Sequence, residues 1–352
     1  MSIPADQARF VDLRSDTVTR PSPEMYEAMM NAPLGDDVLG DEPTVIRLER
    51  LAAETVGKED ALFVPSGTMG NQIAMATHCD RGDAVLIEEE AHMVYYEVGG
   101  PGVIANVVTW TLPSDKGVMD PEVIERHALK RNLHTPGTTL LCLENTHNRA
   151  GGTIVPLATM AAYRQVADRQ GMKIHLDGAR VFNASVGLGV DIKEVTKHVD
   201  TVNFCLSKGL RSPIGSLLCG PSAFIDEARI WRKRLGGGMR QAGILAACGI
   251  VSLTKMVDRL AEDHRRARSV AQSLSELPGL TIDWDRVQTN MVLVITERPA
   301  AEWQAQLQEQ DILCFPVAPN RLRLVFHADV DDEKADRAVA AFARIAGAKT
   351  TA

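Results

Sequence analysis

Residues 201–209 read TVNFCLSKG, an apolar run that predicts a buried strand and leads directly into Ser207 and Lys208. Upstream, residues 174–180 read IHLDGAR, a second apolar run that ends in Asp177. Parallel strands present their carboxyl ends at one edge of a sheet, where open α/β sheets bind ligands. The two runs therefore predict a site that combines a lysine amine with an aspartate carboxylate.

Lys208 and Asp177 together have the chemistry that pyridoxal 5′-phosphate (PLP) requires. A lysine amine holds this cofactor as a Schiff base. A carboxylate beside the pyridine nitrogen keeps that nitrogen protonated, so the ring accepts electrons from a carbanion. Alone, Lys208 would be taken for a loop lysine and Asp177 for a helix cap. Together they predict a PLP enzyme that acts on amino acids or amines.

Apolar strand candidates alternate with helical stretches through the first two thirds of the chain. Fully apolar strands in β-α alternation predict a mostly parallel sheet with helices on both faces, hence an α/β fold. We expect strands at residues 61–64, 84–87, 103–110, 139–144, 173–177, 200–205 and 215–219, and helices at 69–79, 92–98 and 157–170.

The pattern changes near Ile244, where a helical stretch is expected to run to Leu277. Strands at 280–284, 291–295 and 321–326 and helices at 299–308 and 331–345 then predict a smaller α+β unit. We therefore divide the chain into residues 1–243, an N-terminal arm with a large cofactor-binding domain, and residues 244–352, a long helix with a small C-terminal domain. The tail after Gly347 is expected to fray.

The composition is that of an ordinary soluble globular protein: 352 residues, 45% hydrophobic and 24% charged, with a net charge of −8. The acidity argues against nucleic acid or an anionic membrane as the main partner. No apolar run is long enough to span a bilayer, and residues 1–10 lack the features of a signal peptide. The six scattered cysteines contain no C-x-x-C pair, which favours free thiols in a cytoplasmic protein over disulfides or a metal site.

A phosphate cradle is predicted at residues 66–68, which read SGT at a strand-to-helix junction. The amides of Gly67 and Thr68, with the helix dipole, would bind an anion there. A simple helix cap is the competing interpretation. The chain has no G-x-G-x-x-G and no G-x-x-x-x-G-K-[ST] motif, which disfavours a dinucleotide or nucleoside-triphosphate site.

Two histidines follow predicted strands at the same sheet edge. His92 could stack on a pyridine ring or simply cap a helix. His147 could act as general base on a substrate hydroxyl, because a histidine pKa lies near the working pH, or it could stabilise a turn.

Three arginines are candidates for gripping anions. Arg180 and Arg323 could hold a substrate carboxylate through paired N–H donors, or could be surface arginines, which is the interpretation preferred for Arg321. Arg240 follows three glycines whose backbone can approach a ligand closely, and it could contact the phosphate.

The chain resembles the low-specificity L-threonine aldolases, a group of β-eliminating lyases among the fold-type I PLP enzymes, from Val11 to about Val330. That resemblance implies a homotetramer built from tight dimers that share active sites. The matching segments are residues 12–19 (DLRSDTVT), 35–38 (GDDV), 65–71 (PSGTMGN), 144–147 (ENTH), 175–180 (HLDGAR), 206–210 (LSKGL) and 237–241 (GGMRQ).

The resemblance also implies a role for each candidate residue. Lys208 carries the cofactor, Asp177 pairs with its nitrogen and His92 stacks on its ring. Arg240 reaches the neighbouring subunit's site, and His147 lies near the substrate hydroxyl. The phosphate is held by Gly67, Thr68 and Ser207, with Arg180 and Arg240 as further cofactor contacts, and the substrate carboxylate by Ser15, Arg180 and Arg323.

This chain departs from the family pattern at four places: Leu39 stands where Tyr is frequent, Arg211-Ser212-Pro213 where Gly-Ala-Pro is frequent, Gly70 where Ser is common, and residues 148–152 are longer than a frequent Asn-Gly turn. We expect Leu39 and Arg211 to lie near the entrance of the site and to affect substrate range.

The expected reaction is cleavage of the Cα–Cβ bond of L-threonine or L-allo-threonine, which yields glycine and acetaldehyde. The alternative within PLP chemistry is β-elimination or aldol-type transfer on a bulkier β-hydroxy amino acid such as phenylserine. The alternative from another class is a PLP-binding regulator without turnover, which would be coloured but inactive.

Overall fold

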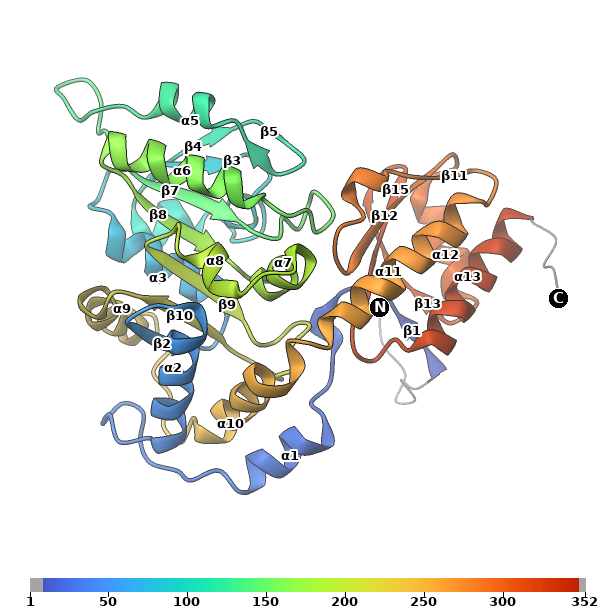
Figure 1. Cartoon of the computed structure of the whole chain (residues 1–352), viewed down its shortest axis with the longest axis horizontal. Helices are drawn as coiled ribbons and strands as arrows, with labels where there is room; N and C mark the ends of the chain where they lie inside the picture. The colour runs from blue at the N-terminus through green and yellow to red at the C-terminus, as the bar shows by residue number, and fades with distance from the viewer. Residues whose placement is uncertain (1–8, 348–352) are drawn as a thin grey trace.

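The computed structural model describes residues 9–347, and its larger unit is built on a seven-stranded sheet (Figure 1). β10 runs antiparallel to both of its neighbours, and every other pair in this sheet is parallel. The predicted mostly parallel sheet is confirmed. In spatial order the strands are β2 (Asp60–Val64), β10 (Ser216–Gly220), β9 (Thr201–Cys205), β8 (Lys173–Asp177), β7 (Thr138–Glu144), β3 (Ala84–Glu88) and β4 (Val108–Leu112).

Helices cover both faces of the sheet because its strands are apolar on both faces. Successive side chains of a strand point to opposite faces, so Phe63 packs in one core cluster while Leu62 and Val64 pack in another. One face carries α2 (Pro43–Val56), α6 (Leu157–Gln170), α7 (Val181–Leu188) and α8 (Ile192–Thr196), and the other carries α3 (Gly67–His78) and α9 (Ser222–Arg234).

The smaller unit is a four-stranded antiparallel sheet with helices, as the α+β prediction requires. Its strand order is β11 (Leu280–Ile282), β12 (Met291–Thr296), β15 (Arg321–Val325) and β14 (Phe315–Ala318). Its helices are α11 (Leu260–Ser275), α12 (Ala300–Gln308) and α13 (Asp332–Ala346). In Figure 1, α11 extends from the side of the large sheet into this unit.

The start of the described chain belongs to the smaller unit. β1 (Val11–Asp12) pairs in parallel with β13 (Ile312–Leu313), and Val11 and Leu13 are buried in the C-terminal core. Figure 1 shows this blue strand among the red elements. The division between residues 243 and 244 stays a prediction, and apolar packing crosses it, because Ala246 lies in the core of the large sheet.

The single helix expected from Ile244 to Leu277 is wrong. The structure has α10 (Gly243–Val251), a π-helical turn at Ser252–Met256, and then α11. The hydroxyl of Ser252 donates to the carbonyl of Leu210 at 2.7 Å, which fixes the chain at the break. α10 packs against α1 (Pro23–Met30) and α2 rather than continuing in the direction of α11.

Two further boundaries differ from the sequence prediction. The strand expected at residues 103–110 begins at Val108, because Pro101–Ala105 forms a π-helical turn that ends in Asn106, with φ of 57°. The helix expected from His92 to Val98 covers only His92–Tyr95 (α4). The fraying expected after Gly347 lies outside the described residues. Between residues 9 and 347, no helix combines the length and the apolarity that a bilayer crossing requires.

Candidate active site

Acidic side chains and the candidate lysine gather at the carboxyl edge of the parallel strands. β3, β7 and β8 end in Glu88, Glu144 and Asp177, and Lys208 follows β9. The pairing register places Glu144 opposite Asp177, and Asp177 opposite Asn203 on β9. Residues far apart in the sequence therefore meet at one sheet edge, as the fold class requires of a ligand site.

The backbone around Lys208 is fixed from two sides. Its carbonyl accepts hydrogen bonds from the Thr19 hydroxyl and from the Arg211 amide, each at 2.9 Å. The side chain is half-buried, and its positive charge acts on both Asp16 and His92. The amine therefore lies within electrostatic reach of the other candidate site residues.

Asp177 is buried and bonded only to amide groups. One carboxylate oxygen accepts the Ala179 N–H at 3.0 Å, and the other accepts the side-chain amide of Asn71 at 2.9 Å. No cation of the described chain is ion-paired with it. A buried carboxylate of this kind suits a protonated ring nitrogen, which supplies the missing positive charge.

His92 is held by two carboxylates, one at its backbone amide and one at its ring. Its backbone amide donates to Glu144 at 2.6 Å, and Nδ1 lies 3.0 Å from Oε1 of Glu97. Burial, the strongest influence, lowers the pKa of His92, but Glu97 and Asp177 outweigh burial and the pKa is raised. The imidazole ring therefore has a fixed orientation close to Asp177. A ring held in this way is suited to stacking on a flat cofactor.

The start of α3 fits an anion. Ser66 caps the helix by accepting the Met69 N–H, and the first helical amides have no intrahelical partner. A Cβ on Gly67 would lie 2.8 Å from Sγ of Cys205, so only glycine lets the backbone lie this deep. The buried hydroxyl of Ser216, 3.6 Å from the same position, has no hydrogen-bond partner among the described residues. Ser207 is half-buried next to Lys208.

Arg180 is oriented by Asp16. Its Nε and Nη2 donate to the two oxygens of that carboxylate at 2.7 and 2.6 Å, and both residues are buried. Burial tends to raise the pKa of Asp16, but Arg180 and Lys208 hold it well below its usual range. Ser15 precedes Asp16, and its hydroxyl accepts the Thr17 N–H at 3.2 Å.

Arg323 approaches the same region from β15. Its Nη1 donates to the side chain of Asn148 at 3.0 Å and its Nη2 to the Arg14 carbonyl at 3.3 Å, while its buried Nε has no partner among the described residues. Burial and then the charge of Arg180 lower the pKa of Arg323. The guanidinium of Arg323 is desolvated and is repelled by that of Arg180. Binding of an anion such as a substrate carboxylate between them would offset both effects.

The structure does not support the general-base role predicted for His147. The residue is 1% exposed, Nδ1 accepts the Ala150 N–H at 3.2 Å, and Nε2 lies 2.8 Å from the Glu88 carboxylate. Both nitrogens are therefore committed, and neither is free to take a proton from a substrate. The turn-stabilising interpretation fits the contacts, because the ring ties the loop at residues 147–153 to the end of β3.

His147→Ala is accordingly expected to lower the free energy of unfolding by about 2–4 kcal/mol, because Glu88 loses a buried partner. Urea unfolding measures this, and kcat and glycine binding are measured on the folded variant. A base role would instead give normal stability and normal glycine binding with a large fall in kcat.

Within one chain, Arg240 makes no contact with the other candidate site residues among the interactions of the described residues. It is exposed and pairs with Asp36 at 3.0 Å. Two of the departures from the family pattern can be placed here. Leu39 lies in the loop that contains Asp36 and is 75% exposed. Arg211 closes the turn after Lys208 at φ of 70°, where glycine would be unstrained, and its guanidinium ties this turn to Asp329 at 2.8 Å.

The buried His175 and the half-buried His78 lie behind the site as neutral rings. Burial lowers the pKa of His175 to about 3 and that of His78 to about 4. The hydroxyl of Thr201 is 2.9 Å from a nitrogen of each ring, and the other nitrogen of His175 is 3.2 Å from Oδ1 of Asn71. A polar chain therefore leads from the sheet interior to the amide that binds Asp177.

The depressed pKa of His175 predicts acid sensitivity. Below pH 6.5, the ordinary pKa of histidine, His175 is protonated in the unfolded chain but stays neutral in the folded chain until about pH 3. The free energy of unfolding therefore decreases as the pH is lowered from 6.5 to about 3. The slope reaches up to about 1.4 kcal/mol per pH unit. Urea unfolding of the wild type and of His175→Asn from pH 7 to pH 4 measures it, and the variant is expected to have the shallower slope. Equal slopes would contradict this assignment.

Sequence reasoning missed the residues that position the candidates. Asp16 and Asn71 lie inside quoted segments, and Glu144 ends a predicted strand, so a search for polar residues next to each candidate would have found them. Glu97 and Asn148 carry no local signal, because their partners His92 and Arg323 meet them only through the fold.

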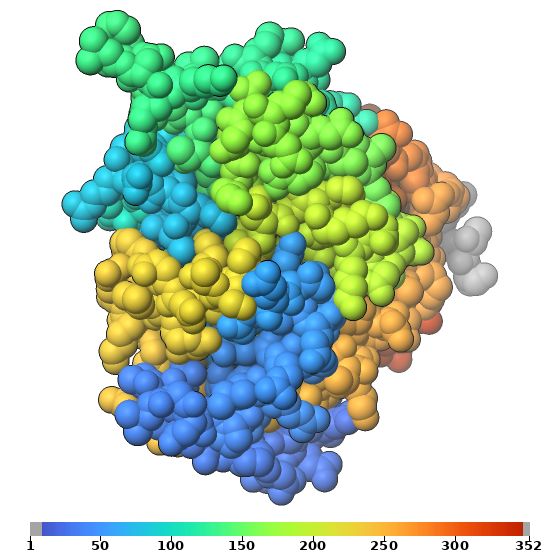
Figure 2. Space-filling model, turned by 60° about the vertical axis from the view of Figure 1, so that its left-hand side comes forward, coloured from blue at the N-terminus to red at the C-terminus, as the bar shows by residue number. Residues whose placement is uncertain are grey.

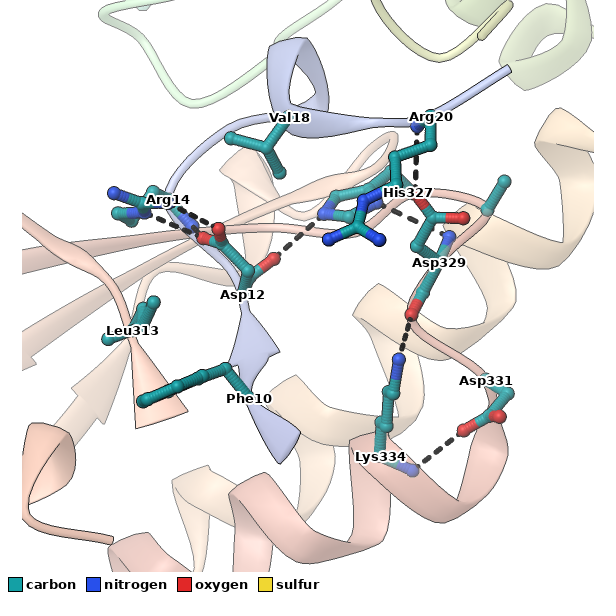
Figure 3. Close-up of a pocket in the computed structure, with 11 residues that line it drawn as sticks. Phe10, Asp12, Arg14, Val18, Arg20, Leu313, His327, Asp329, Asp331 and Lys334 are labelled. Atoms are coloured by element: carbon teal, nitrogen blue, oxygen red, sulfur yellow. Dashed lines mark hydrogen bonds and ion pairs between the residues drawn. The ribbon is translucent and has the colours of Figure 1, made fainter. Parts of the chain in front are cut away.

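A separate cavity of ≈570 Å³ lies in the seam between the N-terminal segment and the smaller unit (Figure 3). Asp12 pairs with Arg14 beside it, and Lys334 donates to the Asp329 carbonyl at 2.7 Å. Neither Lys208 nor Asp177 lines this cavity, so it is not the candidate active site.

Comparison with known proteins agrees with this geometry. Residues 12–297 match the β-eliminating lyase family. The chain is 43% identical to probable low-specificity L-threonine aldolase 2 of Arabidopsis thaliana, covering 96% of this chain and 97% of the relative. It is also 43% identical to the low specificity L-threonine aldolase of Escherichia coli K12, covering 92% and 96%.

Solved structures agree on the fold. The threonine aldolase of Leishmania major superposes with a TM-score of 0.84 at 20% identity, covering 95% of this chain and 99% of the other. The serine palmitoyltransferase of Sphingomonas wittichii gives 0.76 at 18% identity, covering 96% and 88%. The predicted fold-type I architecture is confirmed, and the chain belongs to the β-eliminating lyase family, within the low-specificity L-threonine aldolases, which are carbon–carbon lyases.

Proposed function

We propose that this protein is a PLP-dependent aldolase that cleaves L-threonine and L-allo-threonine to glycine and acetaldehyde. The observation that supports it best is the convergence of Lys208, Asp177 and His92 with the buried Arg180 and the half-buried Arg323 near one sheet edge. A lysine and an aspartate suit the cofactor, and paired guanidinium groups suit an amino-acid carboxylate. Two relatives named as low-specificity L-threonine aldolases, one of them as probable, align with this chain over nearly their whole length, which supports the proposal.

The residues present fit PLP. When bound, PLP supplies an electron sink for the electron pair left on Cα by bond cleavage. Lys208 offers the amine, and Asp177 offers a buried carboxylate for the ring nitrogen. The first amides of α3, beginning at Gly67, offer donors for the phosphate, and the unpaired hydroxyl of Ser216 on the neighbouring strand β10 offers another.

Arg180 and Arg323 would hold the substrate carboxylate, with Ser15 as a further donor. Asp16 keeps the Arg180 guanidinium in one orientation, and Asn148 does the same for Arg323. When two rigid donors fix the carboxylate, the rest of the amino acid has a defined orientation. This orientation selects which of the bonds at Cα is cleaved.

The β-hydroxyl proton needs an acceptor other than His147. Of the two histidines, only His92 keeps a ring nitrogen, Nε2, without a partner among the described residues. Its Nδ1 is held by Glu97, which stabilises the protonated ring. Nε2 of His92, directly or through water, is the acceptor that the geometry supports.

We extend the proposal to a cytoplasmic homotetramer, formed from tight dimers, that contributes to glycine synthesis. Exposed apolar side chains support self-association: Met30 is 80% exposed, and Leu39 is 75% exposed. Figure 2 shows the blue N-terminal surface beside the yellow surface on one face of the molecule. In such an assembly Arg240 would reach the neighbouring subunit's site, which its exposure allows.

Incubation of the purified protein with L-threonine and with L-allo-threonine tests the function, with PLP removed and then restored. Release of glycine and acetaldehyde only when PLP is present is the expected result, and the two rates give the stereopreference. A PLP-binding protein that cleaves neither substrate would overturn the threonine assignment. Phenylserine, assayed in parallel, separates a bulkier substrate from inactivity.

A further inference from the structure

Asn71 on α3 touches two parts of the candidate cofactor site at once. The residue is 1% exposed. Its Nδ2 donates to Oδ2 of Asp177 at 2.9 Å and to Oε1 of Glu97 at 2.8 Å. Glu97 in turn holds the ring of His92. One amide group therefore bridges the carboxylate for the ring nitrogen and the carboxylate behind the stacking histidine.

The orientation of this amide is fixed by its other end. Oδ1 accepts from the side-chain amide of Asn203 at 2.8 Å and lies 3.2 Å from Nε2 of His175. Because the amide oxygen of Asn71 can only accept, Nε2 of the neutral His175 carries the proton and donates to it, which leaves Nδ1 as the unprotonated nitrogen 2.9 Å from the Thr201 hydroxyl. A flipped amide would place N–H groups against these donors and an oxygen against two carboxylates.

The bridge stabilises an arrangement that would otherwise be unfavourable. Asp177, Glu97 and His92 present ligand atoms within 4.8 Å of one another, and Asp177 disfavours ionisation of Glu97. Two N–H groups directed at the two carboxylates reduce their mutual repulsion.

We propose that Asn71 is a positioning residue that holds Asp177 at the ring nitrogen and, through Glu97, holds His92 against the ring face. The inference rests on the proposed function, because it assumes that PLP binds between these groups. In this role Asn71 touches neither the substrate nor the reacting bonds. It fixes the positions of the two groups that contact the cofactor, Asp177 and His92.

Gln72 provides a matched control on the same helix. Its side-chain amide donates to the other oxygen of Glu97 and is 1% exposed, but it makes no hydrogen bond to Asp177. Gln72→Ala therefore loosens only the His92 side, whereas Asn71→Ala loosens both sides. Asn71→Asp keeps the volume and replaces donors with a third carboxylate, which separates hydrogen bonding from packing.

The experiment titrates each apoprotein with PLP and follows the cofactor absorbance, which gives the Kd and the pH midpoint of the spectral change. We expect Asn71→Ala to raise the Kd by about tenfold to a hundredfold, because two charge-assisted hydrogen bonds are lost. Asn71→Asp should raise it further, and Gln72→Ala should stay within about threefold. The pH midpoint should move in the two Asn71 variants and remain in place in Gln72→Ala.

Thermal unfolding of each apoprotein identifies effects on folding alone. A wild-type Kd and an unmoved pH midpoint in Asn71→Ala would overturn the inference, as would equal losses in Asn71→Ala and Gln72→Ala. If Asn71→Ala does not fold, Asn71→Ser decides by the same two readouts. Failure of the wild type to bind PLP would instead overturn the proposed function, so the two failures are distinguishable.

Discussion

Lys208→Ala is expected to abolish turnover, with a loss of at least about a thousandfold in kcat, because it removes the amine that would hold the cofactor covalently. The fold should persist. The contacts that fix this turn, from Thr19 and Arg211, use the backbone carbonyl that alanine retains. Glycine release from L-threonine measures the effect, and the absorbance of the Schiff base should disappear with it.

A Lys208→Arg variant is the matched control, because it keeps the positive charge near Asp16 without a nucleophilic amine. It should be as inactive as the alanine variant. Substantial turnover in either variant would contradict the assignment of Lys208 as the cofactor lysine.

Arg323→Ala is expected to lower kcat/KM for L-threonine by about tenfold to a hundredfold, mainly through KM, because a charge-assisted contact to the carboxylate is lost. Its neighbour on the strand offers a control. Arg321 is two positions away on the same face of β15 and is also half-buried, but no ion pair or side-chain hydrogen bond is formed by it within the described residues.

Steady-state kinetics and glycine binding are measured for both arginine variants. Arg321→Ala should remain within about twofold of the wild type. If the two variants lose the same amount, the loss reflects the strand rather than a carboxylate contact, and Arg323 has no special place in the site.

The sequence predicts the large sheet well because buried parallel strands are continuous apolar runs. Residues 173–177 and 201–205 form strands as expected, and their ends place Asp177 and Lys208 at one edge. The same logic fails where the pattern is mixed. The break in the helix at Ser252 depends on a hydroxyl contact to Leu210, a residue 42 positions earlier, which no local periodicity records.

The candidate site was predicted by residue type, but not by its bonding. His147 has the chemistry of a base, yet the fold uses both of its ring nitrogens for structure, and that depends on Ala150 and Glu88. Asp16 is likewise an ordinary acidic residue in sequence and becomes the clamp of Arg180 only through a contact 164 positions along the chain. Local sequence names the reactive groups, whereas tertiary contacts decide which of them are free.

On the ribosome, the strand that opens the described chain is made about 300 residues before the strand with which it pairs. At about 5–20 residues per second, Val11 remains without its partner strand for roughly 15–60 s. The large sheet can form during this interval, since its last strand ends at Gly220. A nascent chain that stops before β13 would therefore hold Lys208 and Asp177 on a formed sheet, while the carboxylate grip between Arg180 and Arg323 would still await the end of synthesis.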